Sequence, residues 1–360
     1  MKRGSSDLGT DAPAFRAALA AWFERAQRPL PWRTQRSLYR TVVSEFMLQQ
    51  TQVATVLPYF ERWMRALPDF SALAAAGEDT VLKLWEGLGY YRRARFVHRL
   101  AKELSARPHP PRTAAAWAEL TGVGPYTAAA IASLAFDDPA ACVDGNVVRI
   151  IARLANTARE FRDGSSAVKF FTPEAVTLLD RDHPGRHNEA MMELGATICV
   201  RRNPRCDACP VAGFCGARKA GTAHELPRIV RAQPVQQAVD RVWCVRRKAL
   251  LLHRIPESAP RMRGLHELPT AEQARAEVSG LGPTELLATH RRAITRYQIT
   301  ERIFRIDPRK ISPGRSPELV WIPLAKLESV TLSGPHRRWV SGLAITHATG
   351  NLPAATAEPR

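Results

Sequence analysis

The chain has 360 residues, a length at which two domains are the usual arrangement. Its hydrophobic content of 45% and charged content of 24% indicate a globular protein with a real core and argue against a disordered chain. The formal net charge of +18 favours a polyanionic partner, most often nucleic acid, although a generally Arg-rich proteome would also give a basic chain. The first residues lack an apolar signal region, and the apolar run at 127–136 is too short to cross a bilayer. We therefore expect a soluble protein of a reducing compartment.

The first part of the chain, residues 13–225, is predicted to be helical almost throughout. Apolar residues recur there at helical spacing, Pro, Gly and Asp separate the segments, and nothing alternates like a strand. The clearest of these predicted helices cover residues 15–26, 41–64, 78–88, 92–106, 125–136 and 144–155.

The pattern changes after Cys215. The polar stretch that follows is typical of a linker, and short β-branched or alternating segments come after it. We expect strands within residues 240–247, 248–255, 293–306 and 318–324. The fold class predicted from these patterns is an all-α first domain followed by a smaller α+β domain.

A glycine-rich turn, Gly122-Val123-Gly124, joins two predicted helices, and Pro125 opens the second. Two glycines permit positive φ and close backbone approach, and Pro is well placed in a first helical turn. The exposed amides of such a turn form an anion site suited to a DNA phosphate, although a plain helix–helix corner would look the same. Asp144 stands just before another helix, where a simple N-cap is the alternative to a chemical role.

Four of the six cysteines are spaced C-x6-C-x2-C-x5-C, as Cys199, Cys206, Cys209 and Cys215. In a reducing compartment such clustering favours a metal over disulfides. Four thiolates suit tetrahedral zinc as well as an iron–sulfur cluster, so the metal is open on this pattern alone. Cys142 and Cys244 stand apart and are predicted to be buried thiols.

The L-x-G-V-G hairpin at 120–124, the aspartate after it and the cysteine spacing together resemble the helix-hairpin-helix DNA glycosylase superfamily. The resemblance implies that Asp144 is catalytic. It also favours a [4Fe-4S] cluster on the four cysteines over zinc, because the spacing is unlike that of paired C-x2-C zinc ribbons. Arg201, Arg202 and Arg205 would then form a basic loop between the first two ligands.

Three further stretches are similar to the adenine DNA glycosylase family: PLPWR at 29–33, SEFMLQQTQV at 44–53 and WEGLGYYRRAR at 85–95. Position 126 is Tyr, where bifunctional relatives such as endonuclease III carry a nucleophilic Lys. A Tyr forms no Schiff base, so the resemblance implies a monofunctional enzyme. Two alternatives stay open: an endonuclease III-like bifunctional glycosylase and AP lyase, and a non-catalytic iron–sulfur DNA-binding protein.

The chemistry of base removal needs a proton donor and a group that stabilises an oxocarbenium-like sugar. Glu45 has apolar neighbours on its helix, which would raise its pKa and make it a general acid, unless it is a solvated helix residue. The resemblance implies that Glu45 protonates N7 of adenine, that an ionised Asp144 stabilises or traps the cation, and that Tyr126 and Asn146 support the site.

Adenine must leave the base stack before it can react. By resemblance, Gln50 and Tyr90 act as wedges, with Thr51 beside them on the DNA surface; a surface amide and a core Tyr are the alternatives. Gly122, Val123 and Gly124 would contact the phosphate backbone. The adenine pocket maps to Trp32, Arg33 and Glu189, the last of which could equally be a helix-surface charge.

The second domain resembles Nudix hydrolases, as the C-terminal domain of this family does, in its opening hairpin and in the segment at 264–269. The carboxylate-rich Nudix box is absent, so we expect no pyrophosphohydrolase activity. The family's F-[ST]-H loop for 8-oxoguanine is also absent. Thr295 and Arg296 align best with it, and Ala288-Thr289-His290 is a second alignment. A domain that only enlarges the DNA-binding surface is the alternative.

The expected organisation is a disordered segment at 1–12, a glycosylase domain at 13–218 with its cluster loop at 199–215, a linker at 219–239, a Nudix-like domain at 240–350 and a tail at 351–360. The expected substrate is duplex DNA with adenine opposite 8-oxoguanine or guanine. We expect a monomer without a membrane partner, in the bacterial cytoplasm at the nucleoid.

Overall fold

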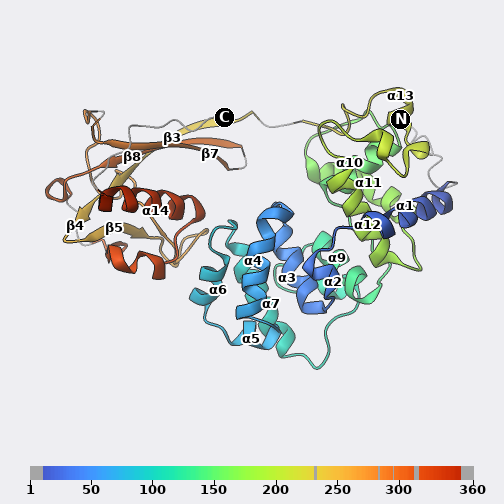
Figure 1. Cartoon of the computed structure of the whole chain (residues 1–360), viewed down its shortest axis with the longest axis horizontal. Coiled ribbons are helices and arrows are strands. Elements are labelled where there is room, and N and C mark those ends of the chain that lie inside the picture. The colour runs from blue at the N-terminus through green and yellow to red at the C-terminus, as the bar shows by residue number, and fades with distance from the viewer. Residues whose placement is uncertain (1–10, 231–232, 283, 295, 312–315, 350–360) are drawn as a thin grey trace. The chain divides into compact units, whose positions relative to one another are not determined.

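The computed structural model describes residues 11–230, 233–282, 284–294, 296–311 and 316–349. The predicted tail at 351–360 and all but the last two residues of the predicted segment at 1–12 therefore lie outside the described residues. Contacts divide the chain into two compact units (Figure 1). The first contains the described residues up to Ala75 and from Phe96 to 230, and the second contains Ala76–Arg95 and the described residues from 233 onward. Among these residues, no helix is both long and apolar enough to cross a membrane.

The first unit is built from helices that follow the amphipathic segments of the sequence. They are α1 (Ala12–Ala26), α2 (Pro31–Thr34), α3 (Leu38–Leu48), α4 (Val53–Ala66), α5 (Phe70–Ala75), α8 (Ala114–Ala118), α9 (Pro125–Phe136), α10 (Gly145–Leu154), α11 (Gly164–Leu178), α12 (Pro184–Thr197) and α13 (Gly216–Ala220), with 3₁₀ turns η2 (Cys206–Ala208) and η3 (Ala212–Phe214). Helix α7 (Arg92–Ser105) begins in the second unit's segment and continues into the first unit.

One core of the first unit lies among α1, α10, α11 and α12, which stand together in Figure 1. Phe15, Phe23, Ile151, Phe171 and Leu194 are at most 2% exposed there. Burial of such large side chains, at about 25 cal/mol per Å² of apolar surface, is the main source of stability for short helices. This core fixes α10 and α12, which carry several of the candidate site residues.

Two details differ from the sequence-based expectation for this half. The helix predicted over 41–64 is two helices, because the polar residues 49–52 form a turn in which Gln50 has φ of 55°. A short strand is also present: β1 (Glu160–Phe161) pairs in parallel with β2 (Arg228–Ile229). Two residues are too few to produce an alternating pattern, so the sequence carried no signal for β1.

The second unit is α+β, as predicted. It contains α6 (Glu78–Trp85), β3 (Val235–Trp243), β4 (Val245–Arg246), β5 (Ala249–Arg254), β6 (His266–Glu267), β7 (Leu286–Ile294), β8 (Tyr297–Arg305), η4 (Pro308–Lys310), β9 (Leu319–Pro323), η5 (Leu324–Ser329) and α14 (Gly334–Thr349). Strands β7 and β8 form an antiparallel hairpin, and β3 pairs in parallel with β8, with Val235 opposite Tyr297. In the other sheet β5 pairs with β4, β6 and β9.

Strand β5 has both faces buried, which explains its continuous apolar sequence. Leu250 and Leu252 point into a core with Trp243 and Trp339, whereas Leu251 joins a second core on the opposite face. The alternation of side chains along a strand sends neighbouring leucines to opposite sides.

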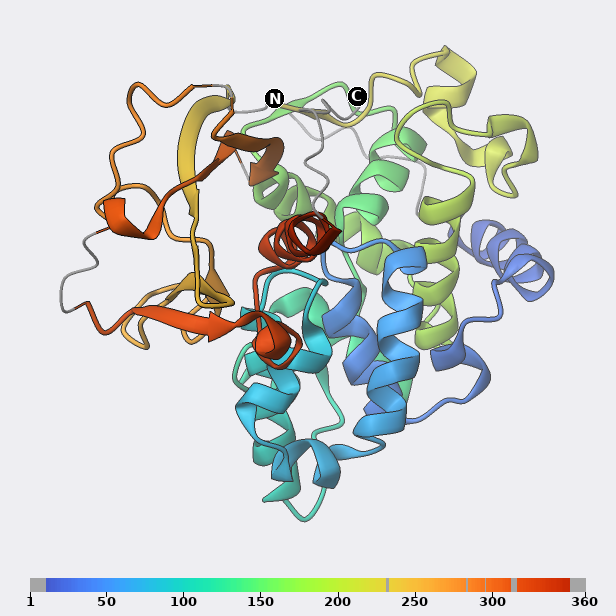
Figure 2. The ribbon, with the colours of Figure 1, turned by 60° about the vertical axis from the view of Figure 1, so that its left-hand side comes forward.

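The structure divides the chain differently from the predicted domain at 13–218, because residues 76–95 group with the second unit. Figure 2 shows η5 beside the cyan segment that contains α6, and Lys83 of α6 donates to the carbonyl of Val330. The predicted linker at 219–239 is also partly ordered, since it contains β2 and the first residues of β3. The local sequence could not show that residues 76–95 group with the second unit or that the linker contains strands, because both features depend on contacts with residues far away in the chain.

Candidate active site and cysteine cavity

Glu45 lies on α3, which begins at its N-cap Ser37, where the hydroxyl accepts a hydrogen bond from the Arg40 amide at 3.2 Å. The Glu45 side chain is buried, and the residue is 6% exposed. Burial first, and then the charges of Asp144 and Glu189, raise the pKa of Glu45 from 4.5 to about 7, although a hydrogen bond from Tyr126 opposes the rise. A solvated helix position for Glu45 is therefore excluded.

Asp144 is the N-cap of α10 and is only half-buried. Its Oδ1 accepts from the backbone amides of Asn146 at 2.8 Å and Val147 at 2.9 Å, and its Oδ2 accepts from Asn146 Nδ2 at 2.9 Å. The three donors hold the side chain at the N-terminus of α10, which is the positive end of the helix dipole. Asp144 is thus both a helix cap and a carboxylate held in one orientation.

The structure brings the two carboxyls together with Tyr126 of α9. Burial, and then the neighbouring charges of Glu45 and Asp144, raise the pKa of Tyr126 well above its usual value, so the phenol stays protonated and can donate. Its hydroxyl also lies 3.9 Å from the sulfur of Met192. Two carboxyls in contrasting environments, one buried and one capped by amides, are suited to an acid and a cation stabiliser.

The candidate adenine-pocket residues lie around a buried ionic cluster. Arg33 of α2 donates to Glu189 at 3.2 Å and to Glu193 at 2.7 Å, both on α12. Arg36 also reaches Glu189, at 2.6 Å, and Arg28 reaches Glu193 at 2.6 Å. Glu189 is 5% exposed, so the alternative of a helix-surface charge is wrong. Separating α2 from α12 would leave the buried carboxylates of α12 without their arginine partners, which is strongly destabilising. The cluster therefore holds α2 against α12.

Trp32 precedes Arg33 in α2 and is 9% exposed. Its ring packs edge-on against Phe60, with the ring centres 5.1 Å apart. Trp32 therefore contributes to the packing that positions α2.

Sequence reasoning missed two buried residues of α12. Glu193 is fully buried and pairs with two arginines, and its spacing of four from Glu189 was the available signal, because such residues share a helix face. Asn188 accepts from the Cys142 amide at 3.1 Å and donates to the carbonyl of Ala140 at 2.8 Å. It braces the segment that leads into Asp144, and no local pattern marked it.

The two candidate wedge residues share one backbone feature. Gln50 and Tyr90 are exposed, and both have positive φ, 55° and 49° respectively. Such conformations are uncommon for residues with a side chain and cluster at functional turns. The two residues lie in different units. Thr51, next to Gln50, is half-buried and donates to the carbonyl of Gln49.

The glycine hairpin uses its two glycines differently. Gly122 has φ of 79°, and a Cβ there would lie 2.3 Å from the ring of Phe96. Gly124 is the N-cap of α9 with an ordinary φ of −85°, and nothing lies within 4 Å of an added Cβ. Gly124 therefore does not use the positive φ that glycine permits, whereas Gly122 does. Both are exposed, whereas Val123 between them is buried and anchors the turn.

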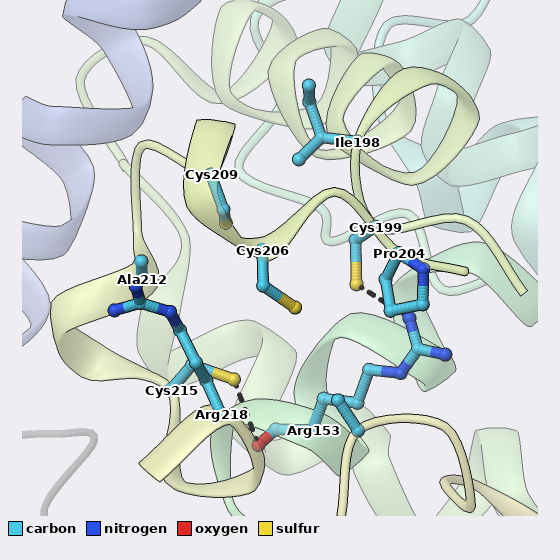
Figure 3. Close-up of a pocket in the computed structure, with 10 residues that line it drawn as sticks. Arg153, Ile198, Cys199, Pro204, Cys206, Cys209, Ala212, Cys215 and Arg218 are labelled. Atoms are coloured by element: carbon cyan, nitrogen blue, oxygen red, sulfur yellow. Dashed lines mark hydrogen bonds between the residues drawn. The ribbon is translucent and has the colours of Figure 1, made fainter. Parts of the chain in front are cut away.

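The four clustered cysteines line a common cavity after α12. Figure 3 shows their sulfur atoms directed into it. Within the described residues no group of three or more His, Cys, Asp or Glu side chains converges closely enough for a single metal ion. Four thiols that line one cavity are the ligand set that an iron–sulfur cluster uses.

The cavity is also poorly suited to free thiolates. Burial, with the other thiols as the main repulsive charges, raises the pKa of Cys209 to about 11, and the pKa of Cys215 is raised for the same reasons. Bound irons would supply the positive charge that thiolates need there.

Helix α10 connects this cavity to Asp144. Arg153 donates to the sulfur of Cys199 at 3.2 Å. Arg149 donates to the carbonyl of Cys199 at 2.8 Å and to Asn146 Oδ1 at 2.9 Å, while Asn146 contacts Asp144. The helix capped by Asp144 thus also holds the first cysteine.

In the second unit, the predicted segment 264–269 contributes Glu267 to a buried network with Arg241, His253 and His336. Burial alone would raise the pKa of Glu267, but these partners lower it to about 2. Glu267 is therefore a paired structural anion of the second unit.

The better of the two predicted 8-oxoguanine alignments falls on the turn between β7 and β8. Arg296 is exposed there, and its guanidinium lies 5.3 Å from the centre of the Tyr297 ring; Thr295 lies outside the described residues. His290, from the second alignment, is inside β7 and stacks on Trp339 at 4.8 Å.

Comparisons with known proteins match two segments of the chain. Residues 43–180 match the HhH-GPD superfamily of base excision DNA repair proteins, and residues 199–215 match the iron–sulfur binding domain of endonuclease III. The cysteines therefore form an iron–sulfur binding domain, as predicted. A thermostable thymine-DNA glycosylase structure covers 59% of this chain and 99% of its own, with a TM-score of 0.51 and 24% identity, which supports the fold.

Curated relatives carry the name adenine DNA glycosylase. The rat protein is 43% identical over 226 residues, 59% of this chain and 43% of its own length, so the chain spans about two fifths of that relative. The Mycolicibacterium smegmatis protein is 38% identical over 206 residues, 56% of this chain and 69% of its own. The Mycobacterium tuberculosis protein is 40% identical and is covered over 67% of its length. This chain belongs to the adenine DNA glycosylase family.

Proposed function

We propose that the chain is a monofunctional adenine DNA glycosylase that removes adenine mispaired with 8-oxoguanine or guanine from duplex DNA. The observation that carries the proposal is the pairing of Glu45, whose pKa is raised to about 7, with Asp144, which three donors hold. The names of the relatives support the choice of adenine.

The reaction follows from the contrast between the two carboxyls. Protonated Glu45 donates its proton to N7 of adenine, and the C1′–N9 bond breaks with its electron pair leaving on the base. Positive charge develops on the sugar, and the carboxylate of Asp144 stabilises or traps it. Water then adds at C1′ and loses a proton, which leaves an abasic site. Tyr126 donates to Glu45 and offers no amine for a Schiff base, which supports base removal without strand cleavage.

Several exposed features would bind the DNA. The amides of the Gly122–Gly124 turn are suited to a phosphate, and Arg201, Arg202 and Arg205 project from the cysteine loop toward solvent. Gln50 and Tyr90 would enter the base stack as adenine leaves it. The iron–sulfur cluster, when bound, crosslinks the loop that carries these arginines and performs no step of the hydrolysis.

We also propose that the second unit reads the base opposite adenine. The exposed Arg296, at the turn of the β7–β8 hairpin, can donate to a guanine edge or a phosphate. Because the F-[ST]-H sequence is absent, this assignment predicts weaker preference for 8-oxoguanine over guanine than a complete loop would give.

The test is a set of four labelled duplexes with adenine opposite 8-oxoguanine, guanine, cytosine or thymine. We expect abasic sites, revealed by strand breaks after alkali, in the first two duplexes. Strand breaks should not form without alkali, and borohydride should trap no covalent complex. Release of pyrimidine lesions instead of adenine would refute the proposal, trapping of a Schiff base would favour the bifunctional alternative, and no base release at all would favour the DNA-binding alternative.

A further inference from the structure

The turn that carries Tyr90 is strained and directed outward. Gly87, Gly89 and Tyr90 all have positive φ, at 107°, 71° and 49°, and the value at Tyr90 is costly for a bulky aromatic residue. Tyr90 is 52% exposed, although Trp85 and Tyr91 around it are at most 3% exposed. A turn of this kind persists only where the surrounding structure holds it.

Part of the support comes from the segment itself. The indole Nε1 of Trp85 donates to the carbonyl of Gly89 at 3.1 Å, and Arg93 donates to the carbonyls of Leu88 and Gly89, both at 3.2 Å. The Arg93 guanidinium also lies 5.3 Å from the centre of the Tyr90 ring. These contacts satisfy the turn's carbonyls and limit the movement of the ring.

The rest of the support comes from residues about 240 positions later in the chain. The hydroxyl of Tyr91 accepts from the Gly87 amide at 3.3 Å and donates to the carbonyl of Leu332 at 2.8 Å. Glu86, with a side chain 7% exposed, accepts from the Leu332 amide at 2.7 Å and from Arg337 Nε at 3.0 Å. The amide of Leu332 is thus hydrogen-bonded to Glu86, before the turn, and its carbonyl is hydrogen-bonded to Tyr91, after the turn.

We propose that residues 332–337 position Tyr90, acting through Glu86 and Tyr91, so that the opening of the A-containing base pair depends on the C-terminal half of the chain. The inference rests on the proposed role of Tyr90 as a wedge. Its physical basis is preorganisation: a ring already held in the inserting conformation does not lose its freedom when it enters the stack. Glu86 and Tyr91 are positioning residues, because they act through Tyr90 and not on the substrate.

A double-mutant cycle in the full chain with its cluster tests this. Tyr91→Phe deletes the bridging hydroxyl and should slow single-turnover adenine release from an A:8-oxoguanine duplex roughly fivefold, the effect of one buried hydrogen bond. Tyr90→Ala should slow release at least as much. Adding Tyr91→Phe to Tyr90→Ala should slow release no further, since the ring to be positioned is gone.

The matched control is Tyr39→Phe in the first unit. The Tyr39 hydroxyl is also buried and bridging, since it donates to the carbonyl of Leu67 at 2.6 Å and accepts from Trp63 Nε1 at 3.0 Å. If Tyr91→Phe acted only by lowering stability, Tyr39→Phe should slow adenine release to a similar extent. Because Tyr39 does not hold the turn of Tyr90, any slowing by Tyr39→Phe should multiply with the slowing by Tyr90→Ala in the double variant.

A second variant tests the other contact. Arg337→Met should repeat the effect of Tyr91→Phe, and Arg337→Lys, which can still donate to Glu86, should recover part of the rate. Multiplicative effects of Tyr91→Phe and Tyr90→Ala would overturn the inference and leave the proposed function intact. A wild-type rate for Tyr90→Ala would remove the wedge and the inference together. No adenine release by the wild type would refute the proposed function, and the inference would fall with it.

Discussion

Replacing Glu45 with Gln should separate catalysis from stability. The native state keeps a proton on Glu45 up to about pH 7, whereas the unfolded chain releases it near pH 4.5. The native state therefore binds more protons over this interval, and its stability falls as the pH rises from about 4.5 to 7. The amide of the variant would be neutral at every pH and would escape that loss. Glu45→Gln should abolish adenine release and yet stabilise the protein at pH 8.

The magnitude follows from the pKa. The pKa of Glu45 rises from 4.5 in the unfolded chain to about 7 in the native state. Ionising Glu45 at high pH therefore costs the native state about 3 kcal/mol of stability, at about 1.4 kcal/mol per tenfold change in proton affinity. Between pH 5.5 and 8 the advantage of the variant should grow by about 2 kcal/mol, since part of the loss has occurred by pH 5.5. For a unit of roughly 200 residues this is about 4–8 °C in melting temperature.

The assay is thermal unfolding of both proteins, with cluster bound, at the two pH values. Glu61→Gln is the matched control, because Glu61 is exposed on α4 and the same substitution there should give no difference that grows with pH. The wild-type rate of adenine release should also fall above about pH 7 as Glu45 ionises. An equal stability difference at both pH values would mean that Glu45 is ionised throughout, and would refute its role as the proton donor.

Three further predictions concern the hairpin, the aspartate and the cluster. Gly122→Ala should lower DNA affinity and cost about 1–3 kcal/mol, through its positive φ and the clash with Phe96, whereas Gly124→Ala should behave as wild type in unfolding and mobility-shift assays. Asp144→Asn should stop turnover but keep DNA binding, because Asn still caps α10; normal cleavage by this variant would contradict our assignment. Cys206→Ala should lose iron, measured by absorbance, together with stability and DNA affinity; normal binding without iron would contradict a structural role for the cluster.

The sequence was most informative where the signal is local. Helical spacing predicted α1, α9 and α10 of the first unit closely, and the turn before Pro125 and the cysteine spacing were each recognisable within 20 residues. These features depend on backbone sterics and on the distance between neighbouring ligands, which short segments already specify. The break at residues 49–52 and the strand pair β1–β2 were not predicted, because each involves too few residues to form a pattern.

By itself, the sequence determined which chemical groups are present: an acid on an apolar helix, an aspartate at a helix start, four cysteines and an excess of arginine. The tertiary structure decided what those groups can do. The pKa of Glu45 depends on burial and on the charges of Asp144 and Glu189, and the two acids of α12 are buried where they pair with Arg33. The placement of Tyr90 depends on a peptide about 240 residues away. Electrostatics and packing act through space, so only the folded chain brings these distant residues close enough to shift a pKa or hold a strained turn.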